Sequence, residues 1–143
     1  MLTKLNAEQI SKFWNEIKEH LEVGLVPYVA VTPDGMTFIL ESLLNDSMQC
    51  WVLRREGEES IFALATTSII VEPASQTKNL VIYSLSGYQV IPRELYQEGM
   101  KVLHEYARTK GCKLILAYTS VLAVERLALQ LGATRAALLS WRI

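Results

Sequence analysis

The fold is decided by a stretch in the last third of the chain, Lys110-Gly111-Cys112-Lys113-Leu114-Ile115-Leu116-Ala117-Tyr118-Thr119-Ser120. Lys110 and Gly111 are typical of the end of a helix, because glycine readily adopts the left-handed conformation that closes one. Residues 112–120 predict a strand, and their apolar character on both faces predicts that helices cover both sides of it. The sequence then predicts a helix over residues 121–131 and a closing strand over residues 134–143. Burial of this kind favours a parallel or mixed sheet.

Size and composition fit one globular domain covering residues 1–143. The chain has 143 residues, within the usual range of about 100–200 residues for a domain. Half of its residues are hydrophobic and its mean hydropathy is +0.19, so a sizeable core can form and some apolar surface is left for a partner. The net charge is −1, from 14 Lys and Arg against 15 Asp and Glu, and it provides no field that attracts nucleic acid. We therefore expect no nucleic-acid partner.

The cysteines and the apolar runs indicate the cellular compartment of the protein. Cys50 and Cys112 lie far apart without a CxxC companion, so their spacing predicts neither a disulfide framework nor a zinc site. We expect two buried free thiols. No signal-peptide pattern opens the chain, and no apolar run approaches the ~20 residues of a membrane span. The sequence predicts a cytoplasmic protein with no metal and no membrane partner.

Periodicity predicts two helices before any confident strand. Asn6 and Gln9 match a capping box, and apolar residues follow at helical spacing up to Gly24. Pro33-Asp34-Gly35 predicts a turn, after which a short apolar helix runs to Asn45-Asp46. We expect the two helices to be hairpin-like neighbours.

From Gln49 the apolar period changes to that of strands. Residues 50–54 and 60–71 predict two strands joined by the hairpin Glu56-Gly57-Glu58-Glu59. Residues 79–85 predict a third strand.

Pro92 fits the first turn of a helix that runs to about Lys110. The predicted order is α-α-β-β-β-α-β-α-β. This order predicts an α/β (α+β) domain, with a mixed, mainly antiparallel sheet flanked by helices and residues 79–85 beside the parallel strand 112–120.

Two segments resemble the Gcn5-related N-acetyltransferase (GNAT) superfamily. Glu105-Tyr106-Ala107-Arg108-Thr109-Lys110-Gly111-Cys112-Lys113-Leu114 looks like the family's third helix running into its fifth strand. Arg126-Leu127-Ala128-Leu129-Gln130-Leu131-Gly132-Ala133 looks like its fourth helix and the turn after it. The resemblance in element order covers residues 6–143. It implies a GNAT-like fold and, in an active member, transfer of an acetyl group from acetyl-coenzyme A to a small amine or a protein amine.

The chain departs from the family where the coenzyme is held. The family cradles the coenzyme A pyrophosphate on backbone N–H groups of a glycine-rich loop at the start of the third helix. Here that place holds Ile91-Pro92-Arg93-Glu94-Leu95-Tyr96, without glycine. Pro92 lacks an N–H, and the Glu94 carboxylate repels phosphate. Ala128 lies where the family often has a tyrosine acting as general acid, and residues 1–5 are too short to count as the family's first strand.

A second resemblance points away from catalysis. Gln49-Cys50-Trp51-Val52 and residues 112–120 look like segments of the degenerate GNAT-like proteins of bacteriophages and prophages, some of them virion-associated. This resemblance implies a protein that works in binding or assembly, with a protein partner or as a homo-oligomer. Whether the chain is such a protein or an active acetyltransferase stays open at this point.

The candidate site residues lie at strand ends. Tyr118 and Ser120 end the buried strand, where open α/β sheets bind ligands, although Ser120 also fits the cap of the next helix. If acetyl-coenzyme A binds, the resemblance implies that the backbone of residues 83–87, with Leu85 and Gly87, holds the pantetheine arm. Arg93 then replaces part of the phosphate cradle.

Histidines and tryptophans fit ordinary structural roles. No serine or cysteine nucleophile accompanies His20 or His104 at a readable spacing, so solvated or helix-terminal positions are favoured over catalytic bases. Trp14, Trp51 and Trp141 are interpreted as core or interface residues. The apolar residues 136–143 either mediate assembly or complete the core, and the sequence leaves both open.

Overall fold

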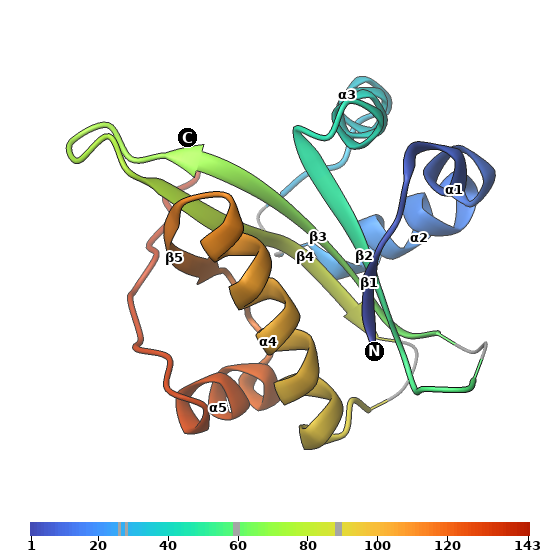
Figure 1. The fold of residues 1–143 in the computed structure, drawn as a ribbon. Helices are drawn as coiled ribbons and strands as arrows, with labels where there is room; N and C mark the ends of the chain where they lie inside the picture. Colours follow the sequence, from blue (N-terminus) through green and yellow to red (C-terminus); the bar gives the residue numbers. More distant parts are fainter. Residues whose placement is uncertain (26, 28, 59–60, 88–89) are drawn as a thin grey trace.

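The computed structural model describes residues 1–143 except residues 26, 28, 59, 60, 88 and 89. The elements in chain order are β1 (Leu2–Lys4), α1 (Ala7–Lys12), α2 (Trp14–Gly24), α3 (Pro33–Leu44), β2 (Met48–Arg54), β3 (Ile61–Val71), β4 (Lys78–Gly87), α4 (Arg93–Thr109), β5 (Cys112–Ala117) and α5 (Leu122–Gln130). The strands form one sheet in the order β1-β2-β3-β4-β5 (Figure 1). Neighbouring strands are antiparallel except β4 and β5, which are parallel. The predicted fold class is confirmed, including residues 79–85 beside a parallel fifth strand.

Helices α1, α2 and α3 cover one face of the sheet (Figure 1). The predicted capping box is confirmed: Asn6 Oδ1 accepts from the Gln9 N–H, and Gln9 Oε1 accepts from the Asn6 N–H, both at 2.9 Å. The expected single first helix is instead two helices, because the backbone leaves helical geometry at Phe13, where φ is −104° and ψ is 16°. Both pack their apolar sides onto the sheet, with Ile10, Ile17 and Leu21 fully buried.

The start of α3 corrects a predicted turn. Pro33-Asp34-Gly35 is the first turn of the helix, because proline is tolerated at the first helical position and Thr32 supplies the cap. Thr32 Oγ1 accepts from the Gly35 N–H at 3.0 Å. Helix α3 contacts both α1 and β2, so the expected neighbourhood of the first helices holds.

Helix α4 crosses the opposite face of the sheet (Figure 1). Leu95, Leu103 and Ala107 are its buried apolar side, and the Tyr106 ring meets the Trp51 ring edge to face, with centroids 5.1 Å apart. Pro92 is the residue before the helix, not a member of its first turn as expected. The helix ends where the sequence predicts, at the C-cap Lys110, and Gly111 takes the left-handed φ of +75°.

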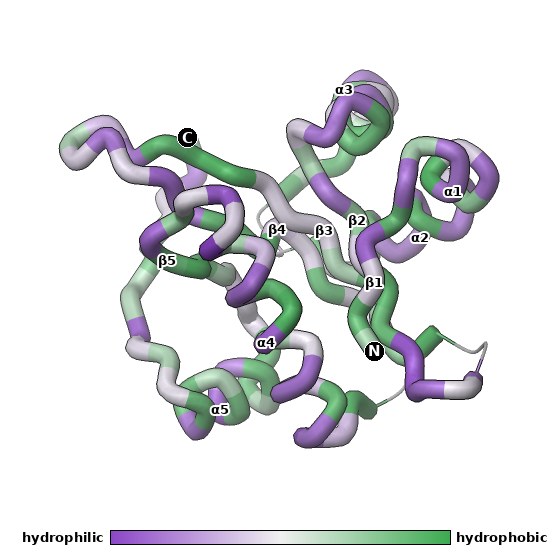
Figure 2. Tube along the Cα trace, viewed as in Figure 1, coloured by the Kyte–Doolittle hydropathy of each residue, from purple (hydrophilic) through white to green (hydrophobic). Residues whose placement is uncertain are grey.

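Apolar stretches lie along the strands of the sheet (Figure 2). Polar side chains buried among them satisfy one another: Trp51 Nε1 donates to Thr67 Oγ1 at 2.9 Å, and Thr67 Oγ1 donates to Gln49 Oε1 at 2.8 Å. Cys50 is a fully buried free thiol, and burial raises its pKa to about 12. Cys112 is also free but only half-buried, which corrects the expectation of two buried thiols.

The hairpin between β2 and β3 falls partly outside the described residues. The two strands pair antiparallel as predicted, and Gly57 has a left-handed φ of +80°. Glu59 and Ser60, the last residue of the predicted hairpin turn and the first of the predicted strand, are not among the described residues.

Both ends of the predicted element order need correction. Residues 2–4 do form a strand, because they can pair with the edge of β2. Residues 134–143 form no strand, and Trp141 is 77% exposed, so the closing strand was a wrong prediction. Apolar residues come there in adjacent pairs, Ala136-Ala137 and Leu138-Leu139, and no strand register buries both members on one face.

Strand β5 is shorter and more open than predicted. It ends at Ala117 instead of Ser120 and lies at an edge of the sheet, where α4 packs against it. Leu114 is 58% exposed, so the expected cover on both faces is wrong. Helix α5 is present as predicted but contains no buried residue. Within the described residues, no helix is long and apolar enough to cross a membrane.

Candidate functional site

The central feature of the site is a β-bulge in β4. Ile82 pairs with Thr67 and Ser84 pairs with Thr66, so Tyr83 is left without a partner on β3. An extra residue of this kind disrupts the ladder, bends the strand and often re-aims a side chain. Here it places Tyr83 on the face covered by α1–α3, where it packs against that core.

Beyond the bulge, β4 and β5 part. Their parallel pairing ends at Ile82 and Ala117, whereas β4 remains paired with β3 as far as Gly87. Residues 83–87 therefore have one backbone edge without a strand partner in the described part of the chain. Backbone N–H and C=O groups on such an edge are available to an extended ligand.

The predicted coenzyme residues gather around this edge. Leu85 is half-buried on the α4 side, in an apolar cluster that also holds Ile91 and Leu95. Gly87 is the exposed last residue of β4, and Arg93 is the exposed first residue of α4. The end of β4 and the start of α4 thus meet in the cluster of Leu85, Ile91 and Leu95. Tyr88, between them, lies outside the described residues.

The start of α4 does not fit a phosphate group. Its N-cap is Pro92, with no side-chain cap hydrogen bond, and Glu94 lies in its first turn. A proline supplies no N–H donor, and a carboxylate at this end of a helix opposes a bound anion. Arg93 is the cation of this turn.

Tyr118 and Ser120 follow directly after β5. Ala117 is the last residue paired with β4, so Tyr118 begins where the two strands separate, and its side chain is 45% exposed. Thr119 Oγ1, not Ser120, accepts from the Val121 N–H, at 3.0 Å. The sequence placed this turn correctly and assigned its hydrogen bond to the wrong residue. Ser120 is exposed.

Helix α2 is held closely against the same end of β4 from the other face. An added Cβ on Gly24 would lie 3.1 Å from the backbone carbon and oxygen of Leu85, closer than most Cβ contacts, so a larger residue would force the two elements slightly apart. One turn earlier, His20 Nδ1 lies 3.0 Å from the buried Ser86 Oγ. Burial lowers the pKa of His20, against the opposing effect of Glu19 and Glu16. His20 is therefore a half-buried contact residue one turn before the end of α2; of the two positions that the sequence favoured, solvated or helix-terminal, the solvated one is wrong.

An apolar cavity of about 290 Å³ adjoins the bulge on the face covered by α3. Tyr83 lines it together with Met48 and Ser68 of the sheet and with residues of α3. Sequence reasoning missed the bulge and this cavity. The signal for the bulge was a change in spacing among the residues that face α4. Leu80 and Ile82 are two residues apart, as in a regular strand, whereas Ile82 and Leu85 are three apart.

No family model matches the sequence, and no curated protein shows significant similarity to it. Solved structures do match its shape. A predicted acetyltransferase from Clostridium acetobutylicum, determined with acetyl-CoA, has 14% identity and a TM-score of 0.70, over 99% of this chain and 95% of that one. The aminoglycoside N-acetyltransferase AAC(6')-Iy, in complex with the bisubstrate analogue CoA-S-monomethyl-acetylneamine, has 14% identity and a TM-score of 0.70, over 100% and 97% of the two chains.

A ribosomal-protein-alanine N-acetyltransferase from Brucella melitensis biovar Abortus 2308 has 13% identity and a TM-score of 0.66, over 100% of this chain and 98% of that one. The chain has the GNAT fold. At these identities the GNAT likeness establishes architecture and leaves the reaction to be argued from the site. The resemblance to phage proteins stays a prediction.

Proposed function

We propose that the protein is an N-acyltransferase that moves an acetyl group from a pantetheine thioester, such as acetyl-coenzyme A, to a small primary amine. The observation that carries the proposal is the bulge at Tyr83 followed by the free edge of residues 83–87, opposite the end of β5. Neighbours of the same fold have been determined with acetyl-CoA or a CoA conjugate, which supports the choice of donor.

The transfer reaction needs few side chains to take part directly. The neutral amine nitrogen attacks the thioester carbonyl carbon, the C–N bond forms, the C–S bond breaks, and one proton passes from nitrogen to the thiolate. The chain's part is to hold the donor along the edge of residues 83–87 and to position the amine. Exposed Tyr118, at the end of β5, is a candidate proton donor to the thiolate, because Ala128 occupies the family's usual tyrosine position.

The donor is held by its pantetheine arm rather than by its phosphates in this proposal. An extended arm with two amides suits a free strand edge, whereas the proline and glutamate at the start of α4 disfavour a pyrophosphate. We therefore expect acetyl-coenzyme A to bind weakly, without reaching micromolar affinity. S-acetyl-pantetheine, which lacks the nucleotide, should bind about 10–150-fold more weakly, the loss expected from the single charge-assisted contact of Arg93.

Backbone amide NMR tests this proposal. Titration with either thioester should shift the signals of residues 83–87 and 117–120. Arg93→Ala should weaken the binding of acetyl-coenzyme A but not of S-acetyl-pantetheine, because a charge-assisted contact to phosphate is worth about 1.5–3 kcal/mol. Lys101→Ala, at an exposed position on the same helix, is the control and should change the affinity for neither thioester. Micromolar affinity for acetyl-coenzyme A would refute the claim that the phosphates are bound weakly. The absence of any signal shift with either thioester at millimolar concentration would refute the transferase function.

A second function is favoured by the sequence at the start of α4. A site without the phosphate glycines fits a GNAT-like domain that has lost catalysis and serves in binding or assembly, as in the phage proteins that the chain resembles. If the chain has this function, neither thioester should shift the amide signals of residues 83–87. The same titration therefore separates the two functions.

A further inference from the structure

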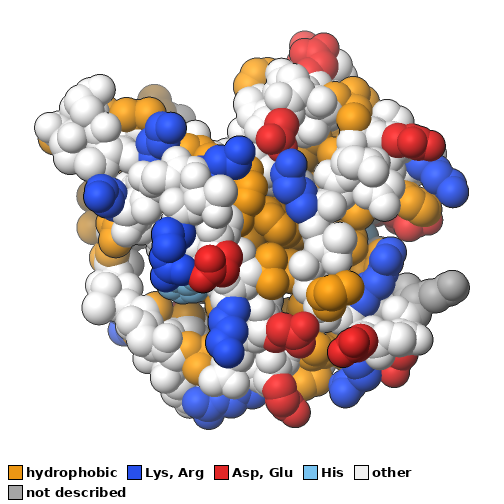
Figure 3. Space-filling model, viewed as in Figure 1, with side chains coloured by type: hydrophobic (Ala, Val, Ile, Leu, Met, Phe, Trp, Pro, Cys, Tyr) orange, Lys and Arg blue, Asp and Glu red, His pale blue; other side chains and the backbone are white. Residues whose placement is uncertain are grey.

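The cavity beside Tyr83 has an apolar wall. Met36, Phe38 and Ile39 of α3 form one side of it, and Met48, Ser68 and Tyr83 of the sheet form the other. Leu25 and residues 29–32, which lie between α2 and α3, also line it. In the same region the molecular surface is hollowed between α3 and the far end of the β3–β4 hairpin (Figure 3).

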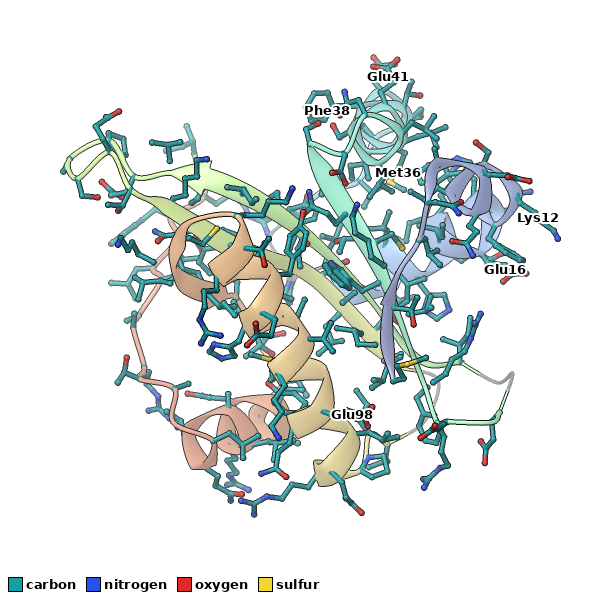
Figure 4. All side chains as sticks on the ribbon, viewed as in Figure 1. Lys12, Glu16, Met36, Phe38, Glu41 and Glu98 are labelled. Carbon is teal, nitrogen blue, oxygen red and sulfur yellow. The ribbon has the colours of Figure 1, made fainter. Side chains whose placement is uncertain are left out.

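The lining contains no charged side chain among the described residues. Its polar side chains are Ser68, Tyr83 and Thr32, and the Thr32 hydroxyl already accepts from the Gly35 N–H. Glu41 is on α3 too but points away from the sheet, whereas Met36 points toward it (Figure 4). A cation placed inside would lose its hydration without gaining a counter-charge, which is strongly unfavourable.

The rim is apolar as well. Phe38 is 66% exposed and Val31 is 40% exposed, although both line the cavity. Apolar side chains left in water around a concave opening mark a binding site for an apolar group. At about 290 Å³ the cavity is at the small end of ligand sites, which usually span about 300–1,000 Å³, so a single ring or a branched chain suits it better than a peptide segment or a helix.

Position connects this cavity to the transfer site. Tyr83 lines the cavity and is also the bulge residue that precedes the free edge of β4. A ligand with its apolar body in the cavity has its other end at the bulge, within the site proposed for the thioester.

We infer that the cavity binds the apolar body of the acceptor, a small primary amine carrying one aromatic ring or branched aliphatic group, with the amine directed toward Tyr83. The inference rests on the proposed transferase function for the identity of the reacting end. It excludes polycationic acceptors such as neamine, the sugar amine joined to CoA in the analogue bound to AAC(6')-Iy.

Methyl NMR tests the inference without any donor. The probes are 2-phenylethylamine, its uncharged analogue 2-phenylethanol, ethylamine, which lacks the ring, and neamine. The two ring compounds should shift the methyl signals of Met36, Ile39 and Met48, and the other two should not. Methyl shifts with neamine or ethylamine, or none with either ring compound at millimolar concentration, would overturn the inference.

Two exposed positions on α3 provide a matched pair of variants. Phe38→Ala should weaken the binding of 2-phenylethylamine about fivefold, because part of the contact with its ring is removed. Glu41→Ala should leave the affinity unchanged. Equal effects of the two variants would count against the cavity.

Acyl transfer separates this inference from the proposed function. Ring binding without any acetylation on addition of acetyl-coenzyme A would support the cavity and count against the transferase. Acetylation of ethylamine as efficiently as 2-phenylethylamine would support the transferase and overturn the cavity's role.

Discussion

At the scale of single residues, the contact between His20 and Ser86 joins helix α2 to the strand that carries the site. Their side chains are 3.0 Å apart, and burial lowers the pKa of the imidazole below its ordinary 6.5. In the unfolded chain the imidazole takes up a proton as the pH falls through about 6.5, whereas the folded protein resists doing so. Protonation therefore favours the unfolded state on the acid side of neutrality.

We predict that the free energy of unfolding falls as the pH is lowered from about 7.5 to 5.5, and that His20→Gln removes part of this fall. Urea unfolding at several pH values measures it. His104→Gln, at an exposed position on α4, is the control and should keep the wild-type slope. Identical pH dependence in wild type and His20→Gln would show that this contact has no influence on proton binding.

At the scale of elements, the packing of α2 on β4 determines how the site is built. Gly24, the last residue of α2, approaches the Leu85 backbone so closely that a methyl group would lie 3.1 Å from two backbone atoms. Backbone cannot move aside as a side chain can, so α2 would have to shift.

Gly24→Ala should destabilise the protein by about 1–3 kcal/mol, although alanine favours helices, because overpacking outweighs propensity. It should also perturb the amide signals of residues 83–87. Gly99→Ala on α4 is a matched control, since its nearest neighbour to an added Cβ is a Leu53 side-chain atom at an ordinary 3.7 Å. Thermal unfolding of both variants decides this, and a Gly24→Ala protein as stable as wild type would show that α2 tolerates displacement.

Elements with local signals were predictable from sequence. The capping box at Asn6, the glycine Gly111 that follows α4 and the β-rich segments that form β2–β4 each follow from residues close in sequence. The break at Phe13 was not predictable, because the apolar spacing continues across it from Ile10 to Ile17.

The site was only partly predictable. Resemblance located the free edge of β4, and composition identified the unsuitable phosphate turn at Pro92 and Glu94. The cavity combines Tyr83 and Met48 with α3, elements that come together only through the sheet order. The apolar run in residues 112–120 was over-interpreted, because apolar residues are equally compatible with an open edge such as β5.

At the scale of the whole molecule, the C-terminal segment of residues 134–143 exposes large apolar side chains. Leu139 is 72% exposed, Trp141 is 77% exposed, and α5 buries none of its residues. The alternative that Trp141 completes the core is wrong in this structure, and the alternative that this surface mediates assembly stays a prediction. Adjacent exposed apolar residues of this kind favour association.

We predict that sedimentation shows a dimer or larger species, which Trp141→Arg dissociates while the far-ultraviolet circular dichroism stays that of a folded protein. Val23→Arg is the control, because Val23 is equally exposed, at 79%, but belongs to α2 and not to the C-terminal segment. A wild-type monomer at high micromolar concentration would contradict the assembly role. Dissociation by both variants equally would show that charge, and not this surface, controls association.

The indole of Trp51 provides a built-in spectroscopic reporter. It is 3% exposed and touches the Tyr106 ring of α4, whereas Trp14 is only partly buried and Trp141 lies in water. Replacing Trp14 and Trp141 by phenylalanine would leave one fluorophore, with blue-shifted emission, at the junction between the sheet and α4. Its emission would then follow the docking of that helix in stopped-flow refolding, separately from the layer formed by α1–α3.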